Sequence, residues 1–193
     1  PDHVRLDSVR TDSAAGVALA LDHLVATGRR HVVFVNGPGS TVPAQMRAAG
    51  FAQATRRVGI ASDTVTADSF TADGGEQAWA RLLSEGRTTQ CDAVLAANDL
   101  LAIGVMRAAR ATGRRIPDDL AVTGIDDIPF APLFSPSLTT VSLGARERGR
   151  LAAELMLGRL ADPGLPPRTV RIAPELIVRE STQRHEELLT GGS

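Results

Sequence analysis

Several residue types are scarce in this 193-residue chain, which has no lysine, no tyrosine and one cysteine, and in which only 3% of residues are aromatic. Every one of the 21 basic residues is therefore an arginine, and 22 acidic residues bring the formal charge to −1. Such a balance gives no general attraction to nucleic acid or to acidic membranes. If the protein acts on DNA, we expect the DNA-binding surface to lie outside this chain.

The single cysteine, Cys91, excludes an internal disulfide, and its place before an apolar run predicts a buried, unreactive thiol. Apolar runs are also short, because none approaches the roughly 18 residues that a membrane helix needs. Residues 1–10 lack the pattern of a signal peptide. We therefore expect no membrane partner.

Sequence signatures of catalysis and of metal binding are missing as well. The four histidines are His3, His23, His31 and His185. They show no HxxxH spacing, and no CxxC pair occurs. No GxSxG motif surrounds a serine, the glycine-rich stretch 36–41 lacks the GK[ST] of a phosphate loop, and GxGxxG is absent. We expect no metal and no cofactor, and an enzyme is the weaker functional class.

Short apolar runs alternate with longer segments of helical spacing along most of the chain. Strands are predicted at 31–35, 63–67, 92–97 and 120–125. Helices are predicted between them at 43–58, 73–85 and 100–113, with another ahead of the first strand at 14–28. This alternation indicates βαβ units, and runs of consecutive apolar residues fit strands that are covered on both faces. The predicted fold class is α/β, with a doubly wound parallel sheet flanked by helices.

The alternation breaks down in the last third of the chain. Residues 129–141 hold three of the eleven prolines and are predicted to form an irregular loop that enters a short strand. A helix is predicted at 145–161, followed by a proline-rich linker and two short strands at 169–173 and 175–179. We expect residues 181–193 to be a mobile tail.

Polar or aromatic side chains follow the predicted strands at the points where they end. Open α/β sheets bind ligands outside the carboxyl ends of their strands, so these positions are candidates for a binding site. The candidates are Asp12 and Ser13, residues 36–41 with Thr41 among them, Arg47, Ser69 and Phe70, Asn98 and Asp99, and Asp126 and Asp127. Carboxylate, amide and guanidinium groups bind adjacent hydroxyls, and an aromatic ring covers the apolar face of a sugar. The set therefore suits a polyhydroxylated small molecule.

Each candidate also has a purely structural interpretation. Asn98 and Asp12 precede helices and could be N-caps, and Asp126 could be a turn residue. Arg47 could be a solvated helix residue, and Phe70 could belong to the core. Only the convergence of several such groups on one edge of the sheet favours a ligand site.

Four segments of the sequence resemble one protein family. They are DHLVATGRRHVVFVNGP, MRAAGF, AVLAANDLLAIGVMRAARATGRRIPDDLAVTGIDDIPFAPLFSPSLTTV and ELIVREST. Through them, residues 23–178 strongly resemble the effector-binding core of the lactose-repressor (LacI) family of bacterial transcription regulators. The motif NDLLAIG is shared with periplasmic sugar-binding proteins of the same fold, whereas RRIPDDLAVTGIDD, SPSLTTV and VREST are more specific to the repressors.

The resemblance implies a periplasmic-binding-protein-like core of two α/β lobes with the effector between them, preceded by a helix-turn-helix and a hinge helix. This chain is then expected to hold the C-terminal lobe, with the N-terminal lobe largely missing and the DNA-binding part upstream of it. By analogy, residues 1–11 end a segment that crosses from the missing lobe, and 12–138 form the C-terminal lobe. Residues 139–168 are a crossing strand and a helix of the other lobe, 169–180 are returning strands, and 181–193 are the tail.

The helix at 145–161 would normally pack within the missing lobe. Its apolar face includes Leu151, Leu155 and Leu160. We therefore expect this helix to dock irregularly, to swap between chains or to expose an apolar patch.

Carried over position by position, the resemblance implies that Arg47, Asn98 and Asp126 contact the effector and that Phe70 forms a wall of the pocket. The weaker ligand candidates are Asp12 and Thr41. Members of the family dimerise through both lobes, and the matching apolar patch in this chain would include Ile103 and Phe134, unless both are core residues.

Three positions depart from the pattern of a typical sugar regulator. Pro43 stands where a hydroxyl residue is common, Leu143 where a polar residue often lies, and Ala145 where an aromatic residue can occur. These departures leave open the kind of ring that is bound.

The predicted function is the effector-binding and dimerisation part of a cytoplasmic, ligand-responsive transcription regulator of the repressor type. Its expected partners are a sugar or related polyol, a second copy of the chain, and operator DNA bound through a helix-turn-helix outside this chain. No covalent chemistry is expected. The first alternative is a periplasmic sugar-binding protein of a transport system, and the second is an α/β enzyme.

Overall fold

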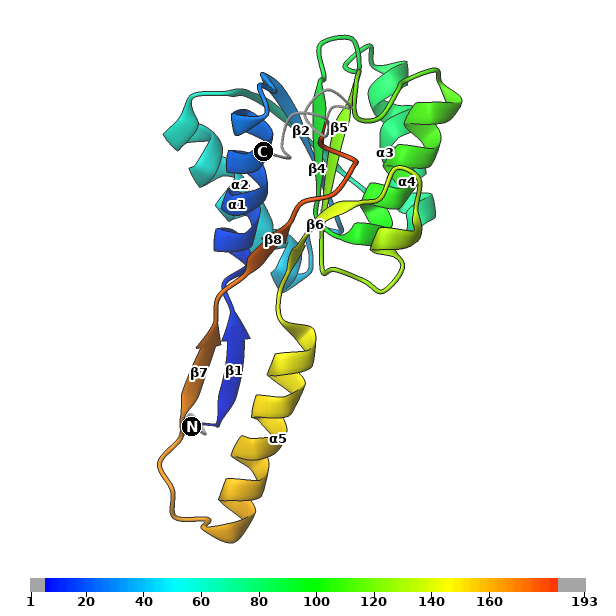
Figure 1. Cartoon of the computed structure of the whole chain (residues 1–193). Coiled ribbons are helices and arrows are strands. Elements are labelled where there is room, and N and C mark those ends of the chain that lie inside the picture. Colours follow the sequence, from blue (N-terminus) through cyan, green and yellow to red (C-terminus); the bar gives the residue numbers. More distant parts are fainter. Residues whose placement is uncertain (1–5, 184–193) are drawn as a thin grey trace, which may run out of the picture.

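A computed structural model of the chain describes residues 6–183 and shows a larger and a smaller unit joined end to end (Figure 1). The larger unit is built on a six-stranded sheet, and the smaller unit contains two paired strands and one long helix. His3, His185 and the part of the predicted tail at 184–193 lie outside the described residues. The prediction that the tail begins at 181 was wrong, because Ser181 and Thr182 are buried and the Ser181 hydroxyl donates to the carbonyl oxygen of Val122 at 2.6 Å.

The six-stranded sheet has the strand order β3-β2-β4-β5-β6-β8. Its strands are β2 (His31–Asn36), β3 (Ala61–Thr66), β4 (Ala93–Ala96), β5 (Ala121–Ile125), β6 (Thr139–Ser142) and β8 (Glu175–Ile177). The first five in this order pair in parallel, which confirms the predicted α/β class, whereas β8 pairs antiparallel with β6. The irregular stretch before β6 contains a short 3-10 turn, η1 (Ala131–Leu133).

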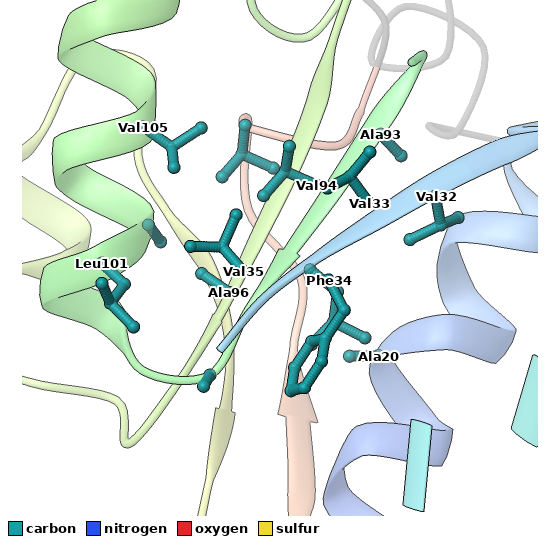
Figure 2. Packing of buried hydrophobic residues seen from close by; sticks show 14 of the residues in the cluster. Ala20, Val32, Val33, Phe34, Val35, Ala93, Val94, Ala96, Leu101 and Val105 are labelled. Atoms are coloured by element: carbon teal, nitrogen blue, oxygen red, sulfur yellow. The ribbon is translucent and has the colours of Figure 1, made fainter. Parts of the chain in front are cut away.

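Helices cover both faces of this sheet (Figure 1). On one face lie α1 (Ser13–Ala26) and α2 (Val42–Val58), and on the other lie α3 (Ala72–Ser84) and α4 (Asp99–Ala111). In Figure 2, Phe34 of β2 points towards Ala20 of α1, while Val35 points towards Leu101 of α4. Because both faces are covered, consecutive residues of the strand are buried, and all four side chains named here are fully buried.

Helices α3 and α4 approach each other closely at two glycines. A Cβ atom on Gly104 would lie 1.9 Å from the carbonyl oxygen of Ala72, and a Cβ atom on Gly75 would lie 2.2 Å from the carbonyl oxygen of Leu101. Real Cβ atoms do not come this near to a backbone oxygen, so any side chain at either position would push the helices apart. The two glycines therefore set the distance between α3 and α4.

The smaller unit consists of the parallel pair β1 (Ser8–Thr11) and β7 (Thr169–Ile172), against which α5 (Ala145–Ala161) packs. One apolar residue of α5, Leu155, is buried, whereas Met156, Leu157 and Leu160 are between 60% and 71% exposed. An apolar cavity of about 400 Å³ lies between Leu160 and the start of β1. The structure thus follows the third of the three outcomes expected for this helix, an exposed apolar patch.

Three segments of the chain connect the two units: β1 leads into α1, β6 leads into α5, and β7 leads into β8 (Figure 1). Two of them are tied together by a hydrogen bond of 2.7 Å from the Thr11 hydroxyl to the Leu143 carbonyl oxygen. The assignment of the smaller unit to a second lobe remains a prediction. Within residues 6–183, no helix combines the length and the apolar character needed to cross a membrane.

Candidate functional site

The carboxyl ends of the parallel strands face the smaller unit. Strand β6 runs parallel to β5 and continues directly into α5, so the carboxyl ends of both strands lie on the side from which α5 departs (Figure 1). Since β2, β4 and β5 are mutually parallel, their carboxyl ends share this edge. This carboxyl edge is where ligands bind in sheets of this kind.

Arg47 and Asp126 meet at the carboxyl edge. Arg47 lies in α2, is only 7% exposed, and donates a hydrogen bond of 2.6 Å from Nη1 to the carbonyl oxygen of Ala97, just past the end of β4. Its Nη2 lies 3.4 Å from Oδ1 of Asp126, which follows β5 directly. Because the Asp126 side chain is 40% exposed, its carboxylate remains accessible from the open side of the pair.

Burial and charge act in opposition on this pair. Burial raises the pKa of Asp126, and the positive charges of Arg47 and Arg148 act against that rise. Burial likewise lowers the pKa of Arg47, and Asp126 counteracts that shift. Each group therefore supports the ionised form of the other, and the pair places one carboxylate and one guanidinium side by side at the carboxyl edge.

The turn that carries Asp126 is held by a second, more deeply buried network. Asp126 and Asp127 both have positive φ angles, 120° and 51°, which non-glycine residues rarely adopt. Oδ2 of Asp99, the first residue of α4, accepts a hydrogen bond of 2.8 Å from the backbone N–H of Ile128, and the hydroxyl of Thr140 donates to Oδ1. Asp99 is fully buried, and this burial raises its pKa to about 6.

Asp127 extends the same network to the end of the returning segment. The carboxylate of Asp127 pairs with Arg179 at 2.8 Å, and its backbone N–H donates to the Thr140 hydroxyl at 3.3 Å. Arg179 also donates to the carbonyl oxygen of Leu138 at 2.7 Å. The turn at the carboxyl edge is thereby bound both to β6 and to the segment that follows β8.

Asn98 is the N-cap of α4, and its side chain also contacts the backbone of Phe70. Its side-chain oxygen caps α4 by accepting from the backbone N–H of Leu101 at 2.9 Å, and its Nδ2 donates to the carbonyl oxygen of Phe70 at 3.2 Å. The Phe70 ring packs directly on Gly37, where an added Cβ atom would lie 2.2 Å from the ring. Asn98 therefore holds the segment that carries the ring.

Asp12 and Thr41 act as helix caps. Asp12 accepts hydrogen bonds of 3.0 Å from the backbone N–H groups of Ala14 and Ala15, and Thr41 accepts one of 3.3 Å from Ala44. Of the six residues that the resemblance implies, Arg47 pairs with Asp126 and Asn98 binds the backbone of Phe70, whereas Asp12 and Thr41 only cap their own helices. A ligand role for any of the six remains a prediction.

Of the two residues predicted at a dimer interface, Ile103 is buried and Phe134 is partly buried. Ile103 is 5% exposed within the core, and Phe134 is partly buried against it. Among the residues near them in the sequence, Leu100, Phe130 and Leu133 are apolar side chains that are between 41% and 77% exposed.

Two further groups bear on the chemistry of the larger unit. Cys91 is buried, and burial raises the pKa of its thiol to about 12, which agrees with the predicted unreactive thiol. Within the described part of the chain, no three or more His, Cys, Asp or Glu side chains cluster so as to hold a metal ion.

Sequence reasoning missed Arg148, which acts on both members of the Arg47–Asp126 pair although it belongs to α5 of the smaller unit. It also missed Arg179 as the partner of Asp127. Arg148 lies in α5 of the smaller unit, and the strand predicted at 175–179 ended on Arg179 itself, so a search for polar residues directly after the predicted strands selected neither.

Comparison with known proteins identifies the family. Residues 21–182 match the periplasmic binding protein-like domain. The chain is 33% identical over 178 residues to a ribose operon repressor of Halalkalibacterium halodurans, covering 92% of this chain and 53% of the repressor. It spans about half the length of the curated relatives that it matches.

Two solved structures are similar to this one. A LacI family transcriptional regulator from Enterococcus faecium with bound ribose has a TM-score of 0.84 and 30% identity, over 94% of this chain and 67% of that one. A lac repressor dimer bound to operator and the anti-inducer ONPF has a TM-score of 0.83 and 28% identity, over 95% of this chain and 63% of that one. The chain therefore belongs to the periplasmic binding protein-like domain family, where it groups with LacI-family transcriptional regulators.

Proposed function

We propose that the chain is the effector-binding part of a ligand-responsive transcription regulator, and that a sugar or related polyol binds at the carboxyl edge. The Arg47–Asp126 pair carries this proposal. It combines a buried guanidinium, anchored at 2.6 Å to the carbonyl oxygen of Ala97, with a carboxylate that remains 40% exposed. Vicinal hydroxyls bind such donor and acceptor pairs without covalent chemistry.

Binding there would act on the connections between the units. The turn that holds Asp126 is bound through Asp99 and Thr140 to β6, and through Asp127 and Arg179 to the returning segment. A ligand that contacts both units would favour one arrangement of these segments over another. The regulator would convert that preference into a change of operator affinity through a helix-turn-helix outside this chain.

The working form of the regulator is proposed to be a cytoplasmic homodimer without enzymatic activity. The similarity to a lac repressor dimer bound to operator supports this assembly. Leu100, Phe130 and Leu133 are exposed apolar side chains close in sequence to the predicted Ile103 and Phe134, and we propose that they belong to the surface that contacts a second copy.

The coding sequence upstream of Pro1 distinguishes this proposal from a transport-type sugar-binding protein. We expect it to encode the remainder of a second α/β lobe, preceded by a basic helix-turn-helix. A signal peptide ahead of that lobe, with no helix-turn-helix, would instead favour a periplasmic binding protein and would refute the regulatory half of the proposal.

A further inference from the structure

The turn that carries Asp126 depends on its surroundings for its conformation. Asp126 and Asp127 both have positive φ angles, which non-glycine residues keep only where neighbouring groups fix them. Three successive backbone N–H groups of this turn are bound: the first by the backbone of β6 at 2.9 Å, the second by the Thr140 hydroxyl at 3.3 Å, and the third by Oδ2 of Asp99 at 2.8 Å. Groups from β6 and α4 therefore fix the direction of the backbone on which Asp126 stands.

Asp99 is the central group of these contacts. Its side chain is fully buried, and its Oδ1 accepts a hydrogen bond from the same Thr140 hydroxyl that binds the turn. Gly124 of β5, which pairs with Thr140 of β6, makes room for the carboxylate, since a Cβ atom there would lie 2.2 Å from Oδ1. The ion pairs formed within residues 6–183 do not include Asp99. A buried carboxylate without a paired cation is unfavourable for folding, so its place is explained by what its hydrogen bonds hold.

The groups that face Asp99 act on it in different directions. Its pKa is raised to about 6, chiefly by burial and also by the negative charges of Asp126 and Asp127, while the two hydrogen bonds that it accepts oppose the rise. Arg47 is the positive group within reach, because the charge of Asp99 raises the pKa of Arg47. The bonds that hold the turn therefore also favour the ionised form of Asp99, and a proton on Asp99 competes with them.

We infer that Asp99 and Thr140 are positioning residues of the effector site, which hold the turn so that Asp126 stands against Arg47 and which do not contact the ligand themselves. Both side chains are fully buried and offer no surface to a ligand. The inference rests on the proposed function and deepens it, because it adds residues that act on the effector through Asp126.

Protonation of Asp99 has two consequences of opposite sign. Because its pKa is raised above the usual 3.8, the ionised form is disfavoured in the folded protein, and the contribution of Asp99 to the free energy of unfolding rises as the pH falls through 6 towards 4. A neutral carboxyl group is a weaker acceptor than a carboxylate, so the turn is held less firmly and effector affinity falls over the same interval. A residue that acted only on stability would move both quantities in the same direction.

Calorimetry on the intact protein tests this pH dependence with a series of mono- and disaccharides that includes ribose, lactose and cellobiose. For the wild type, we expect the affinity for a sugar that binds to fall by roughly tenfold between about pH 7.5 and about pH 5.5. Asp99→Asn keeps the shape of the side chain but cannot ionise. It should bind roughly tenfold more weakly at the higher pH and lose most of the dependence on pH. A fall in acid that is unchanged in Asp99→Asn would belong to Asp126 and would refute the inference.

Thr140→Val provides a second variant, which decides the question alone if Asp99→Asn does not fold. It removes the hydroxyl and keeps the branched shape, so sugar affinity should fall roughly tenfold. The midpoint of the pH dependence should also move to higher pH, because Asp99 loses a hydrogen-bond donor. Thr140→Ser restores the hydroxyl and should restore both properties. Asp92→Asn is the matched control, because Asp92 also accepts hydrogen bonds from two backbone N–H groups but lies before β4, at the opposite edge of the sheet.

Hydrogen exchange of the sugar-free protein tests the turn itself. In mass spectrometry, a peptide that covers residues 126–130 should exchange faster in Asp99→Asn and Thr140→Val than in the wild type and Asp92→Asn. Equal exchange in all four would refute the inference and leave the proposed function intact, as would faster exchange with sugar affinity unchanged. If no sugar of the series binds the wild type, the proposed function fails, and the inference fails with it.

Discussion

Arg47→Ala is expected to abolish the effector response of the intact regulator while operator binding persists. The substitution removes a guanidinium that is 7% exposed and leaves the Ala97 carbonyl oxygen and the Asp126 carboxylate without their partner. The effector would lose hydrogen bonds from a charged donor, each worth about 1.5–3 kcal/mol, which corresponds to roughly a tenfold to hundredfold loss of effector affinity. Titration of operator release with the effector measures this change.

Two variants make the Arg47 result specific. Arg56→Ala removes an exposed arginine from the same helix and should respond like the wild type. Arg47→Lys keeps the charge but cannot span both acceptors with a planar fork, so it should retain only part of the response. If Arg47→Ala binds operator and releases it at the wild-type effector concentration, the site is wrongly assigned.

Gly104→Val is expected to lower the free energy of unfolding by about 3 kcal/mol or more. A Cβ atom at this position would lie 1.9 Å from the carbonyl oxygen of Ala72, which is backbone and cannot rotate away. The side chain must therefore separate α3 from α4 and disturb the core between them. Denaturant unfolding of the wild type and the variant measures the loss.

Gly149→Ala is the matched control for this prediction. Gly149 lies inside α5, is exposed, and has no heavy atom within 4 Å of the place where a Cβ atom would stand. An alanine there should leave stability unchanged or raise it by up to about 1 kcal/mol, because glycine is a poor helix former. A Gly104 variant as stable as this control would contradict the close helix contact.

Much of the fold could be predicted because its elements have distinct local patterns. The helix predicted at 145–161 is α5 with the same bounds, and the strand predicted at 31–35 is one residue shorter than β2. The antiparallel direction of β8 was not predicted. Its three residues follow a short connection from β7, and no local pattern distinguishes a parallel neighbour from an antiparallel one.

The candidate site could be predicted only in part. Arg47 and Asp126 were predicted to lie at the same edge because they follow parallel strands, whose carboxyl ends share one edge of the sheet. Position at a strand end does not distinguish a ligand-binding amide from a helix cap, and Asn98 serves as a cap. Arg148 could not be found in this way, because it lies in α5 of the smaller unit and not at the end of a predicted strand.

We propose that this chain makes DNA binding depend on a small ligand. The most direct test measures which genomic DNA fragments of the host the intact protein retains, with and without each of a series of mono- and disaccharides. We expect retention of a few specific fragments, and a saturable change in that retention when one sugar is added. A protein that binds a sugar with high affinity but retains no specific DNA at any sugar concentration would contradict this role in DNA binding.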